Sequence, residues 1–478
     1  MSDTDQSAGG ESADRRTALE RLLGAFAKVE AGEGITVVLM FITIFLILSS
    51  YYVLKVVREG LIIGSGGIMG LSGAELKSYS AGAMAFLLIP VVRGYGTLAS
   101  RVNRVKLLNI SIGVVIGCLG LFYVLGHLGV PLALPFFLWL GMVNVFLISQ
   151  FYSYANDIYT EEQGKRLLAV IAIGGSLGAI LGPKIAQLGK DYTFLLMVLA
   201  AAVLGICLFL YNVIDRRELR VRTGADTQEQ PQEEAPLGKE GGFQLVITDR
   251  YLLLIALMLL IANLVNTTGE YILTTTVEQH AIETVPDARF AHIEDLEERA
   301  LAIKEARRPI GNEFYGSFYG LVNLVGFLIQ AFLVSRIFKY AGVRAALFVL
   351  PVIAFGGYLA IAWLGGLAVL RVAKTAENSV DYSLQNTVRQ ALFLPTSREA
   401  KYKAKAAIDT FFVRFGDAMS AALVAYGVRG LELGAKGFAF VNVGLVVVWL
   451  VIVVGIVRRH RKLSREEDVA GAAEAHAA

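Results

Sequence analysis

The sequence predicts an all-α polytopic membrane protein whose twelve transmembrane helices form two pseudo-symmetric six-helix halves. Three observations support this fold class: an apolar composition, twelve apolar stretches and a polar linker that divides them six and six. Of the 478 residues, 55% are apolar and only 18% are charged, whereas soluble domains carry about 25% charged residues. A soluble core cannot hide this much apolar surface. The composition excludes a disordered, collagen-like or disulfide-stabilised secreted protein, and the two cysteines show no metal-ligand spacing.

The first half follows a polar N-terminal segment. We expect no cleavable signal peptide, because the first apolar run is too long for an h-region. A spanning helix needs about 20 mainly apolar residues. The six stretches of this half that meet this length have approximate cores at 35–57, 77–92, 107–126, 133–155, 167–187 and 193–214.

The second half follows a linker rich in Gln, Glu, Pro and Gly. Its six stretches have approximate cores at 251–275, 313–335, 345–363, 366–390, 406–428 and 437–457. The eighth is preceded by a long extracytoplasmic insert, in which Arg289 to Arg308 is expected to form an amphipathic surface helix. The expected organisation is an N-terminal segment at 1–34, a first half at 35–214, a linker at 215–250, a second half at 251–457 with the insert at 278–311, and a tail at 458–478.

The distribution of positive charge orients the chain in the membrane. The segments on the side of the N-terminus carry 28 Lys and Arg residues, and the opposite side carries 9. Cytoplasmic loops carry the excess of Lys and Arg in membrane proteins. We therefore expect both termini to be cytoplasmic, in a bacterial inner (plasma) membrane.

The two halves resemble each other at corresponding positions. The loop after the second stretch, Gly96 to Arg104, combines Gly and Arg, as does Ser335 to Arg344 after the eighth. Parallel repeats related by an axis along the membrane normal are the plan of the major facilitator fold. The first of these loops is similar to that superfamily's signature loop, with Ser100 in place of the usual Asp.

Ionisable residues inside the membrane indicate the functional site, because each costs about 2.5 to 3.5 kcal/mol at a helix centre. The tenth stretch carries a polar stripe of six residues at spacings of three or four: Arg371, Lys374, Glu377, Asp381, Gln385 and Arg389. This spacing places them on one helical face, over about 27 Å. We expect this face to be exposed to water.

Three other stretches carry shorter polar stripes. These are Tyr51, Lys55, Arg58 and Glu59 in the first, Gln150, Ser153 or Tyr154, and Asp157 in the fourth, and Asn263, Asn266 or Thr267, Glu270 and Thr274 in the seventh. With the tenth, they supply one stretch from each three-helix unit, as a central transport cavity requires. The eleventh adds Asp409, Arg414 and Asp417, for which a helix-locking role is favoured. Helix locking is also open for Lys374 with Glu377 and Asp381, and for Arg58 and Arg389.

Cations in both halves favour an anionic substrate, since guanidinium groups bind phosphate oxygens in a bidentate manner. The chain contains no G-x-x-x-x-G-K-[ST] phosphate loop and no His or Cys cluster with metal-ligand spacing. We therefore expect a transporter and not an enzyme, without a cofactor or metal. The glycine run Gly174, Gly178 and Gly182 is interpreted as a helix-packing surface.

Three segments carry a resemblance to a known family. Tyr51 to Glu59, Tyr154 to Arg166 and, most specifically, Asp381 to Asp409 resemble the ATP/ADP antiporters, the nucleotide transporters of plastids and obligate intracellular bacteria. The resemblance implies exchange of one nucleotide for another. It also implies that Arg58, Asp157, Glu270 and Arg389 stand where the family keeps its functionally important charges, with Arg58 and Arg389 in place of the lysines typical of that family.

These observations lead to one hypothesis and two alternatives. The expected function is nucleotide antiport, ATP for ADP or a related pair, by alternating access through a cationic central cavity, with nucleotide and lipid bilayer as partners and no nucleic acid. The expected substrate-binding residues are Lys55, Arg58, Asp157, Glu270, Lys374 and Arg389, and the expected gating or helix-locking charges are Glu59, Glu377, Asp381, Asp409, Arg414 and Asp417. A transporter of another phosphorylated or organic anion, and a non-transporting receptor or assembly protein on this scaffold, remain open.

Overall fold

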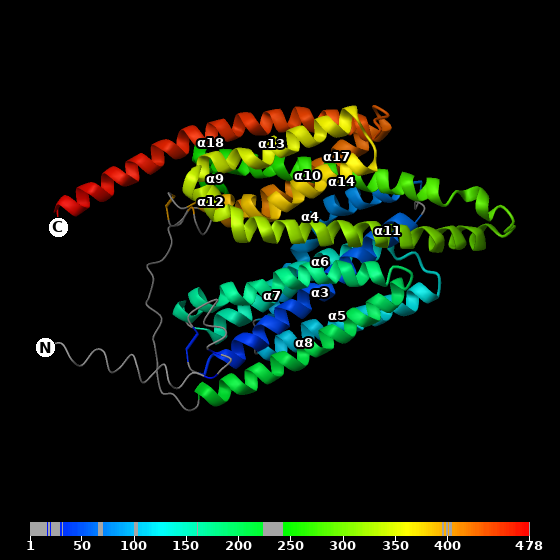
Figure 1. Cartoon of the computed structure of the whole chain (residues 1–478), viewed down its shortest axis with the longest axis horizontal. Helices are drawn as coiled ribbons and strands as arrows, with labels where there is room; N and C mark the ends of the chain where they lie inside the picture. Colours follow the sequence, from blue (N-terminus) through cyan, green and yellow to red (C-terminus); the bar gives the residue numbers. More distant parts are fainter. Residues whose placement is uncertain are drawn as a thin grey trace. The chain divides into compact units, whose positions relative to one another are not determined.

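The computed structural model is built of helices (Figure 1). It describes residues 17, 20, 29–30, 32–65, 70–99, 104–159, 161–222, 242–393, 396–397, 400 and 404–477. The chain divides into two compact units. Unit 1 comprises Met1–Gly60, Pro90–Gln230 and Tyr315–Gly320, and unit 2 comprises Leu61–Ile89, Pro231–Phe314 and Leu321–Ala478. Each unit therefore includes one segment from the opposite half of the sequence.

The helices of the first half of the sequence are long and apolar. They are α3 (Gly34–Gly64), α4 (Gly73–Ala99), α5 (Arg104–His127), α6 (Ala133–Ile158), α7 (Glu161–Leu188) and α8 (Thr193–Arg222). Helix α7 packs on α3 through its glycines. A Cβ at Gly178 would overlap the carbonyl oxygen of Phe45, and one at Gly182 would lie 2.5 Å from the carbonyl oxygen of Ser49. The small-residue packing surface expected from the sequence is confirmed.

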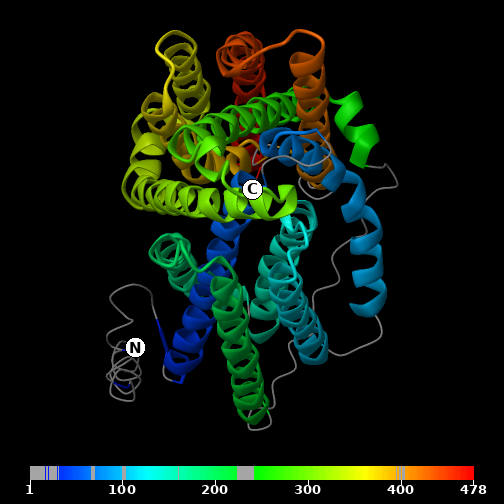
Figure 2. The same cartoon turned by 90° about the vertical axis from the view of Figure 1, so that its right-hand side faces the viewer.

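In unit 2, α10 (Arg250–Thr284) packs against most of the other long helices. Its neighbours include α14 (Leu367–Val380), α17 (Val413–Arg429) and α18 (Ala435–Ala477), and α13 (Gly342–Trp363) packs in turn on α14 and α18. In Figure 2, α10 (green) lies beside the yellow, orange and red helices of this unit. The polar residues of α10 therefore face protein on several sides.

One more long helix, α11 (Leu296–Leu328), and several shorter elements complete the described part of the second half. The shorter elements are α9 (Gly242–Thr248), the 3₁₀ turn η1 (Asp287–Phe290), α12 (Val334–Tyr340), α15 (Asn386–Ala391), α16 (Lys405–Ala407) and the π-helical turns η2 (Ile329–Leu333), η3 (Asp381–Gln385) and η5 (Ile408–Phe412). The turn η3 joins α14 to α15, and η5 joins α16 to α17.

The helices agree with the twelve expected spans. Within the described residues, nine segments are long and apolar enough to cross a membrane: Gly34–Gly64, Lys106–His127, Ala133–Ala155, Arg166–Leu188, Thr193–Glu218, Arg250–Thr284, Leu296–Tyr340, Gly342–Trp363 and Ala435–Arg461. The second, tenth and eleventh expected spans are helical too, as α4, as α14 with η3 and α15, and as α16 with η5 and α17. These three are less apolar because they carry much of the buried charge.

The insert at 278–311 differs from its expected form. Helix α10 continues to Thr284, and α11 begins at Leu296, where the Asp295 carboxylate accepts hydrogen bonds from the N–H groups of Glu297 and Glu298. From Leu296 the helix runs without a break into the eighth span, so the separate surface helix expected over Arg289 to Arg308 is wrong. The guanidinium of Arg307 donates to the carbonyl oxygen of Val285 and pairs with Asp287 at 2.6 Å, which fixes the turn.

Candidate substrate-binding site

The charged residues of unit 2 gather around one face of α10. Asn263, Asn266, Glu270 and Thr274 recur along this helix at spacings of three and four, and so share a face. At Gly269 the neighbouring helices approach closely, since a Cβ there would overlap the Tyr358 hydroxyl oxygen and lie 3.0 Å from Lys374 Nζ. The absence of a side chain at this position leaves the space that two polar groups occupy.

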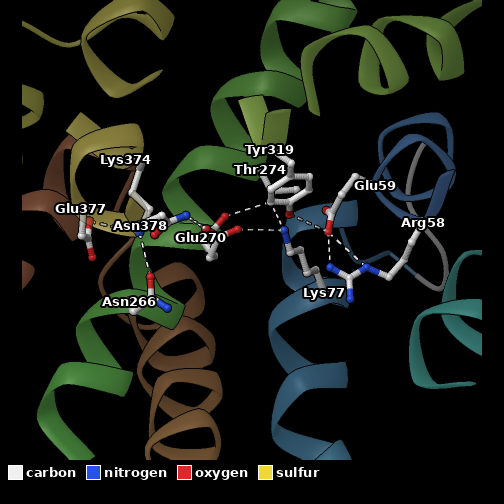
Figure 3. Close-up of polar contacts among 10 residues, drawn as sticks. All are labelled: Arg58, Glu59, Lys77, Asn266, Glu270, Thr274, Tyr319, Lys374, Glu377 and Asn378. Carbon is white, nitrogen blue, oxygen red and sulfur yellow. Dashed lines mark hydrogen bonds and ion pairs between the residues drawn. The ribbon is translucent and has the colours of Figure 1, made fainter. Parts of the chain in front are cut away.

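Glu270 links α10 to α4 and α14 (Figure 3). Lys77 Nζ of α4 lies 3.3 Å from Glu270 Oε2 and donates to Thr274 Oγ1 at 3.2 Å. The amide nitrogen of Asn378 on α14 donates to Glu270 Oε1 at 3.2 Å. The Lys77 side chain is 9% exposed and that of Glu270 is 20% exposed. This ion pair is therefore largely buried but reachable from solvent through the carboxylate.

A second ion pair lies deeper in the same unit. Lys374 Nζ lies 3.1 Å from Glu377 Oε2, with side-chain exposures of 0% and 8%, and donates to Asn266 Oδ1 at 3.0 Å. The Tyr358 hydroxyl on α13 donates to Glu377 Oε2 at 3.0 Å. These contacts tie α10, α13 and α14 together, so the helix-locking interpretation is favoured for Lys374 and Glu377. The sequence predicted that the polar stripe would be exposed to water. In the structure, the middle of the stripe is instead buried in protein.

The C-terminal end of the stripe carries a third ion pair. Arg389 donates to Asp409 Oδ1 from Nη2 at 2.6 Å and from Nε at 3.1 Å. Beside it is a cavity of about 80 Å³ whose polar lining residues are Asn263, Asn266, Glu377, Asp381 and Arg389. A cavity of this volume can hold water molecules beside the Arg389 guanidinium.

Two predicted site residues belong to π-helical turns. Asp381 begins η3, and Asp409 is the second residue of η5. Single π turns inside α-helices occur frequently at functional sites. A strict four-residue spacing drifts around a helix of 3.6 residues per turn. The wider turn at Asp381 opposes this drift between Glu377 and Arg389.

Unit 1 contains a separate charged group on α3. The Arg58 guanidinium pairs with the carboxylate of Glu59, which is fully buried and accepts a hydrogen bond from the Tyr319 hydroxyl at 3.3 Å. Lys55 Nζ lies 4.0 Å from the centroid of the Tyr319 ring, and the Arg58 guanidinium lies 4.5 Å from that of Phe137. Cations over aromatic faces gain favourable electrostatic energy. The three charges expected near the end of the first span are thus placed together.

Two further sets of predicted residues lie on α17 and α6. Asp417 accepts hydrogen bonds from Asn263 at 2.7 Å and Thr267 at 2.9 Å and pairs with Arg414 at 3.3 Å, which ties α17 to α10. Asp157 lies at the end of α6 and is partly exposed. Among the residues that the structure describes, no group of three or more His, Cys, Asp or Glu side chains is arranged to hold a metal ion.

Sequence reasoning missed Lys77, Tyr319 and Tyr358. Lys77 lies at the first position of the expected second span, where a lysine is ordinarily taken for a residue at the membrane interface. The two tyrosines lie in apolar stretches, where such residues are ordinary. The burial of Lys77, which explains why it pairs with an acid, is known only from the structure.

Comparison with known proteins identifies the fold. No protein-family model matches the chain, and no curated protein matches it significantly. Solved structures do match. One, described as a bacterial homologue of the iron transporter ferroportin in an inward-facing state, has a TM-score of 0.59 at 12% identity and covers 88% of this chain and 98% of its own. A POT family transporter in complex with 5-aminolevulinic acid has a TM-score of 0.58 at 14% identity, with coverages of 89% and 96%.

The nucleoside transporter NupG matches with a TM-score of 0.52 at 14% identity, covering 88% of this chain and 97% of its own. At these identities the likeness shows the fold alone. The chain is therefore an integral membrane protein with the major facilitator fold of membrane transporters, with two pseudo-symmetric sets of six helices.

Proposed function

We propose that the protein is a secondary transporter that exchanges nucleotides, ATP for ADP or a related pair, by alternating access. The observation that carries this proposal is the set of membrane-embedded cations in both units, three of which are in unit 2: Lys55, Arg58, Lys77, Lys374 and Arg389. Cations at membrane depth mark substrate pathways. Arginine and lysine are the residues that bind phosphate groups in proteins.

The nucleotide is supported by the resemblance of three segments to the ATP/ADP antiporters. Two of these three segments contain an arginine that forms an ion pair: Arg58 pairs with Glu59, and Arg389 pairs with Asp409. In this proposal these two arginines bind the phosphate groups, and Lys55 and Lys374 increase the positive potential. Glu270 and Asp157 act as counter-ions of the empty protein, and the helix-locking charges are Glu59, Glu377, Asp381, Asp409, Arg414 and Asp417.

The proposal includes an orientation. The excess of Lys and Arg on one side of the expected spans supports cytoplasmic termini and a bacterial inner membrane. Exchange, in contrast, draws its support from the family resemblance. Ion pairs with carboxylates neutralise Lys77, Lys374 and Arg389, so electrostatics alone does not require the empty protein to stay in one conformation.

Uptake into proteoliposomes tests the substrate. Vesicles containing the purified protein and loaded with ADP should accumulate labelled ATP above protein-free vesicles. Unlabelled ADP should suppress this uptake, and adenosine, which lacks phosphate, should not. Suppression by adenosine as strong as that by ADP would contradict binding through the phosphate groups.

A transporter of a less highly charged phosphorylated anion is the second candidate. It is favoured by the pairing of Lys77, Lys374 and Arg389 with carboxylates, because a balanced site attracts a highly charged anion less strongly. The same vesicles distinguish the two. Suppression of ATP uptake by a sugar phosphate at lower concentration than by ADP would favour this candidate.

A further inference from the structure

Asp381 differs from the other charges assigned above to helix locking. Each of the others forms an ion pair: Glu59 with Arg58, Glu377 with Lys374, Asp409 with Arg389, and Asp417 with Arg414. Within the part of the chain that the structure describes, the Asp381 carboxylate forms neither an ion pair nor a hydrogen bond. It is half-buried at the first residue of η3. A carboxylate that is not paired with a cation is disfavoured in a membrane-spanning helix.

The cavity beside Arg389 contains a second polar group that lacks a partner. Trp449 of α18 lines this cavity together with Asp381, and the residue is only 2% exposed. Among the described residues, its indole Nε1 has no hydrogen-bond partner. An indole N–H can only donate. It therefore requires an acceptor inside the cavity, and the cavity can hold water.

A water molecule in this cavity can bind both groups. It accepts the N–H of Trp449 and donates one of its own O–H groups to the Asp381 carboxylate. Asn263, which also lines the cavity, donates from its amide nitrogen to the Val413 carbonyl oxygen and to Asp417 Oδ1, both at 2.7 Å. Its amide oxygen is thus the atom that it offers to a water. A buried water makes about three hydrogen bonds, and these three side chains supply that number.

The balance of charge around the cavity favours a proton as its ligand. The charged groups that act on Asp381 along its own helix are Glu377, Lys374 and Arg389. Glu377 and Lys374 neutralise each other, as do Arg389 and Asp409. The negative charge of Asp381 is therefore in excess, and one proton removes it.

The ionisable groups on the neighbouring elements have partners of their own. Tyr358 of α13 donates to Glu377, and Asp417 of α17 pairs with Arg414. On α10, Glu270 forms its ion pair with α4. The turn η2, which packs on η3, contains no ionisable side chain in its described sequence. The cations in these contacts are thus already engaged by acids other than Asp381.

We propose that this cavity is a proton-binding site, in which Asp381 binds one proton and a water held by Trp449 carries that proton to and from solvent. The proton resides on a carboxylate oxygen of Asp381 and leaves by the same route, and no other bond changes. In the neutral form the Asp381 O–H donates to the water, which still accepts from Trp449. In this role Asp381 is a gating charge and not a helix lock.

Proton binding changes the potential at Arg389. While Asp381 is ionised, two carboxylates act on this arginine, Asp409 in direct contact and Asp381 at longer range. Protonation of Asp381 leaves only Asp409, so the site becomes more attractive to an anion. This link to anion binding rests on the proposed function, whereas the proton site itself does not depend on the substrate.

Tryptophan fluorescence tests the proton site, because the chain has three tryptophans, Trp139, Trp363 and Trp449. In the double variant Trp139→Phe with Trp363→Phe, all tryptophan emission comes from Trp449. The emission of this protein in detergent is recorded from about pH 4 to about pH 9, a range that includes the titration of buried carboxyl groups. One transition that follows the binding of a single proton is expected, and the further change Asp381→Asn should abolish it. Emission independent of pH, or a transition that survives Asp381→Asn, would overturn the proposal.

Glu278→Gln in the same background is the matched control. It removes another partly buried carboxylate of unit 2, which accepts the N–H of Ala74 at 3.1 Å and does not line the cavity. The transition should persist in this variant, and its loss would contradict the assignment to Asp381. Replacing choline chloride by sodium chloride at constant pH should leave the emission unchanged. A response to sodium would assign the cavity to a metal cation and overturn the proton assignment.

Infrared difference spectroscopy of the unmodified protein supplies a second measurement, which does not require Asp381→Asn to fold. Lowering the pH should produce the C=O band of a protonated carboxyl group. Trp449→Phe removes the N–H but keeps an aromatic ring, and it should shift the frequency of that band because the water loses one of its partners. Identical bands in both proteins would place the titrating acid outside this cavity. No nucleotide is present in any of these measurements, so their failure leaves the proposed function standing.

Discussion

Gly269 illustrates how single residues determine the site. Because Gly269 has no side chain, the Tyr358 hydroxyl and Lys374 Nζ lie directly against α10, where the hydroxyl donates to Glu377 and Lys374 donates to Asn266. A buried ion pair such as that of Lys374 with Glu377 stabilises a protein only when its geometry and remaining hydrogen bonds are satisfied. The glycine is thus a condition for the polar contacts that hold these helices together.

Gly269→Ala should lower the stability of the purified protein by about 1–3 kcal/mol, because the new methyl group overlaps the Tyr358 hydroxyl oxygen. Adding Tyr358→Phe removes that oxygen and should restore part of the loss. Gly356→Ala on α13 is the control, since a Cβ there meets no atom within 4 Å. Thermal unfolding in detergent measures all three. Equal melting temperatures for Gly269→Ala and Gly356→Ala would show that the contact is not tight.

Arg389 has two roles to separate, binding substrate and locking Asp409. Arg389→Ala should lower nucleotide exchange tenfold or more while the protein still inserts into membranes, because it removes a phosphate-binding group and leaves Asp409 without its cation. The exchanged pair, Arg389→Asp with Asp409→Arg, restores an ion pair but not the position of the cation. Recovery of exchange in that double variant would show that Arg389 acts by pairing with Asp409 and does not bind the substrate.

The residue types at the site could be predicted, but their partners could not. The spacing of the stripe from Arg371 to Arg389 correctly places Lys374, Glu377 and Arg389 on one helix. A polar face of a helix, however, is the same in sequence whether water or a neighbouring helix covers it, so the burial of Lys374 was not foreseeable. The pairing of Glu270 with Lys77 joins residues 193 positions apart, and local spacing carries no information on such a contact.

At the scale of elements, the first span is anchored at its N-terminal end. The Glu33 carboxylate, just before α3, accepts hydrogen bonds from the N–H of Glu30, from Gln163 and from Arg166 on α7. Burial acts to raise the pKa of Glu33, but the hydrogen bonds from Glu30, Arg166 and Gln163 outweigh it, so the pKa lies below its ordinary value of 4.5. Glu33 therefore stabilises the folded protein when it is ionised.

Glu33→Gln should lower the stability by up to about 1 kcal/mol near neutral pH, because this carboxylate is only partly shielded from solvent. Since the pKa is lowered by folding, the contribution is complete above 4.5 and is lost as the pH falls below that value. Melting temperatures of both proteins between about pH 7 and about pH 4 should therefore converge at the acid end. A difference that is independent of pH would contradict the charge-based explanation. Glu30→Gln, which changes a more exposed partner of Arg166, serves as the control.

The helical elements themselves follow from the sequence to different degrees. Long apolar runs such as Gly34–Gly64 were predictable because length and hydropathy alone define them. The π-helical turns η3 and η5 were not, since no residue pattern in their sequences distinguishes them from α-helix. The start of α11 at Leu296 depends on the cap at Asp295, a signal that was present in the sequence but was not used.

At the scale of the whole molecule, exchange of nucleotides has an electrical consequence. ATP carries one more negative charge than ADP. A membrane potential should therefore shift the exchange by about 2.3 kcal/mol per 100 mV. Imposing a potassium diffusion potential on proteoliposomes measures this effect. Exchange that does not respond to the potential would show that the two exchanged anions carry equal charge.

The dependence of ATP uptake on internal ADP is the most direct test of the central claim. Labelled ATP is offered to proteoliposomes that contain ADP, to vesicles that contain inorganic phosphate and to empty vesicles, each with the same amount of folded protein. Nucleotide antiport predicts rapid uptake only where ADP is inside. Equal uptake by empty vesicles, or no uptake by any of the three, would contradict it.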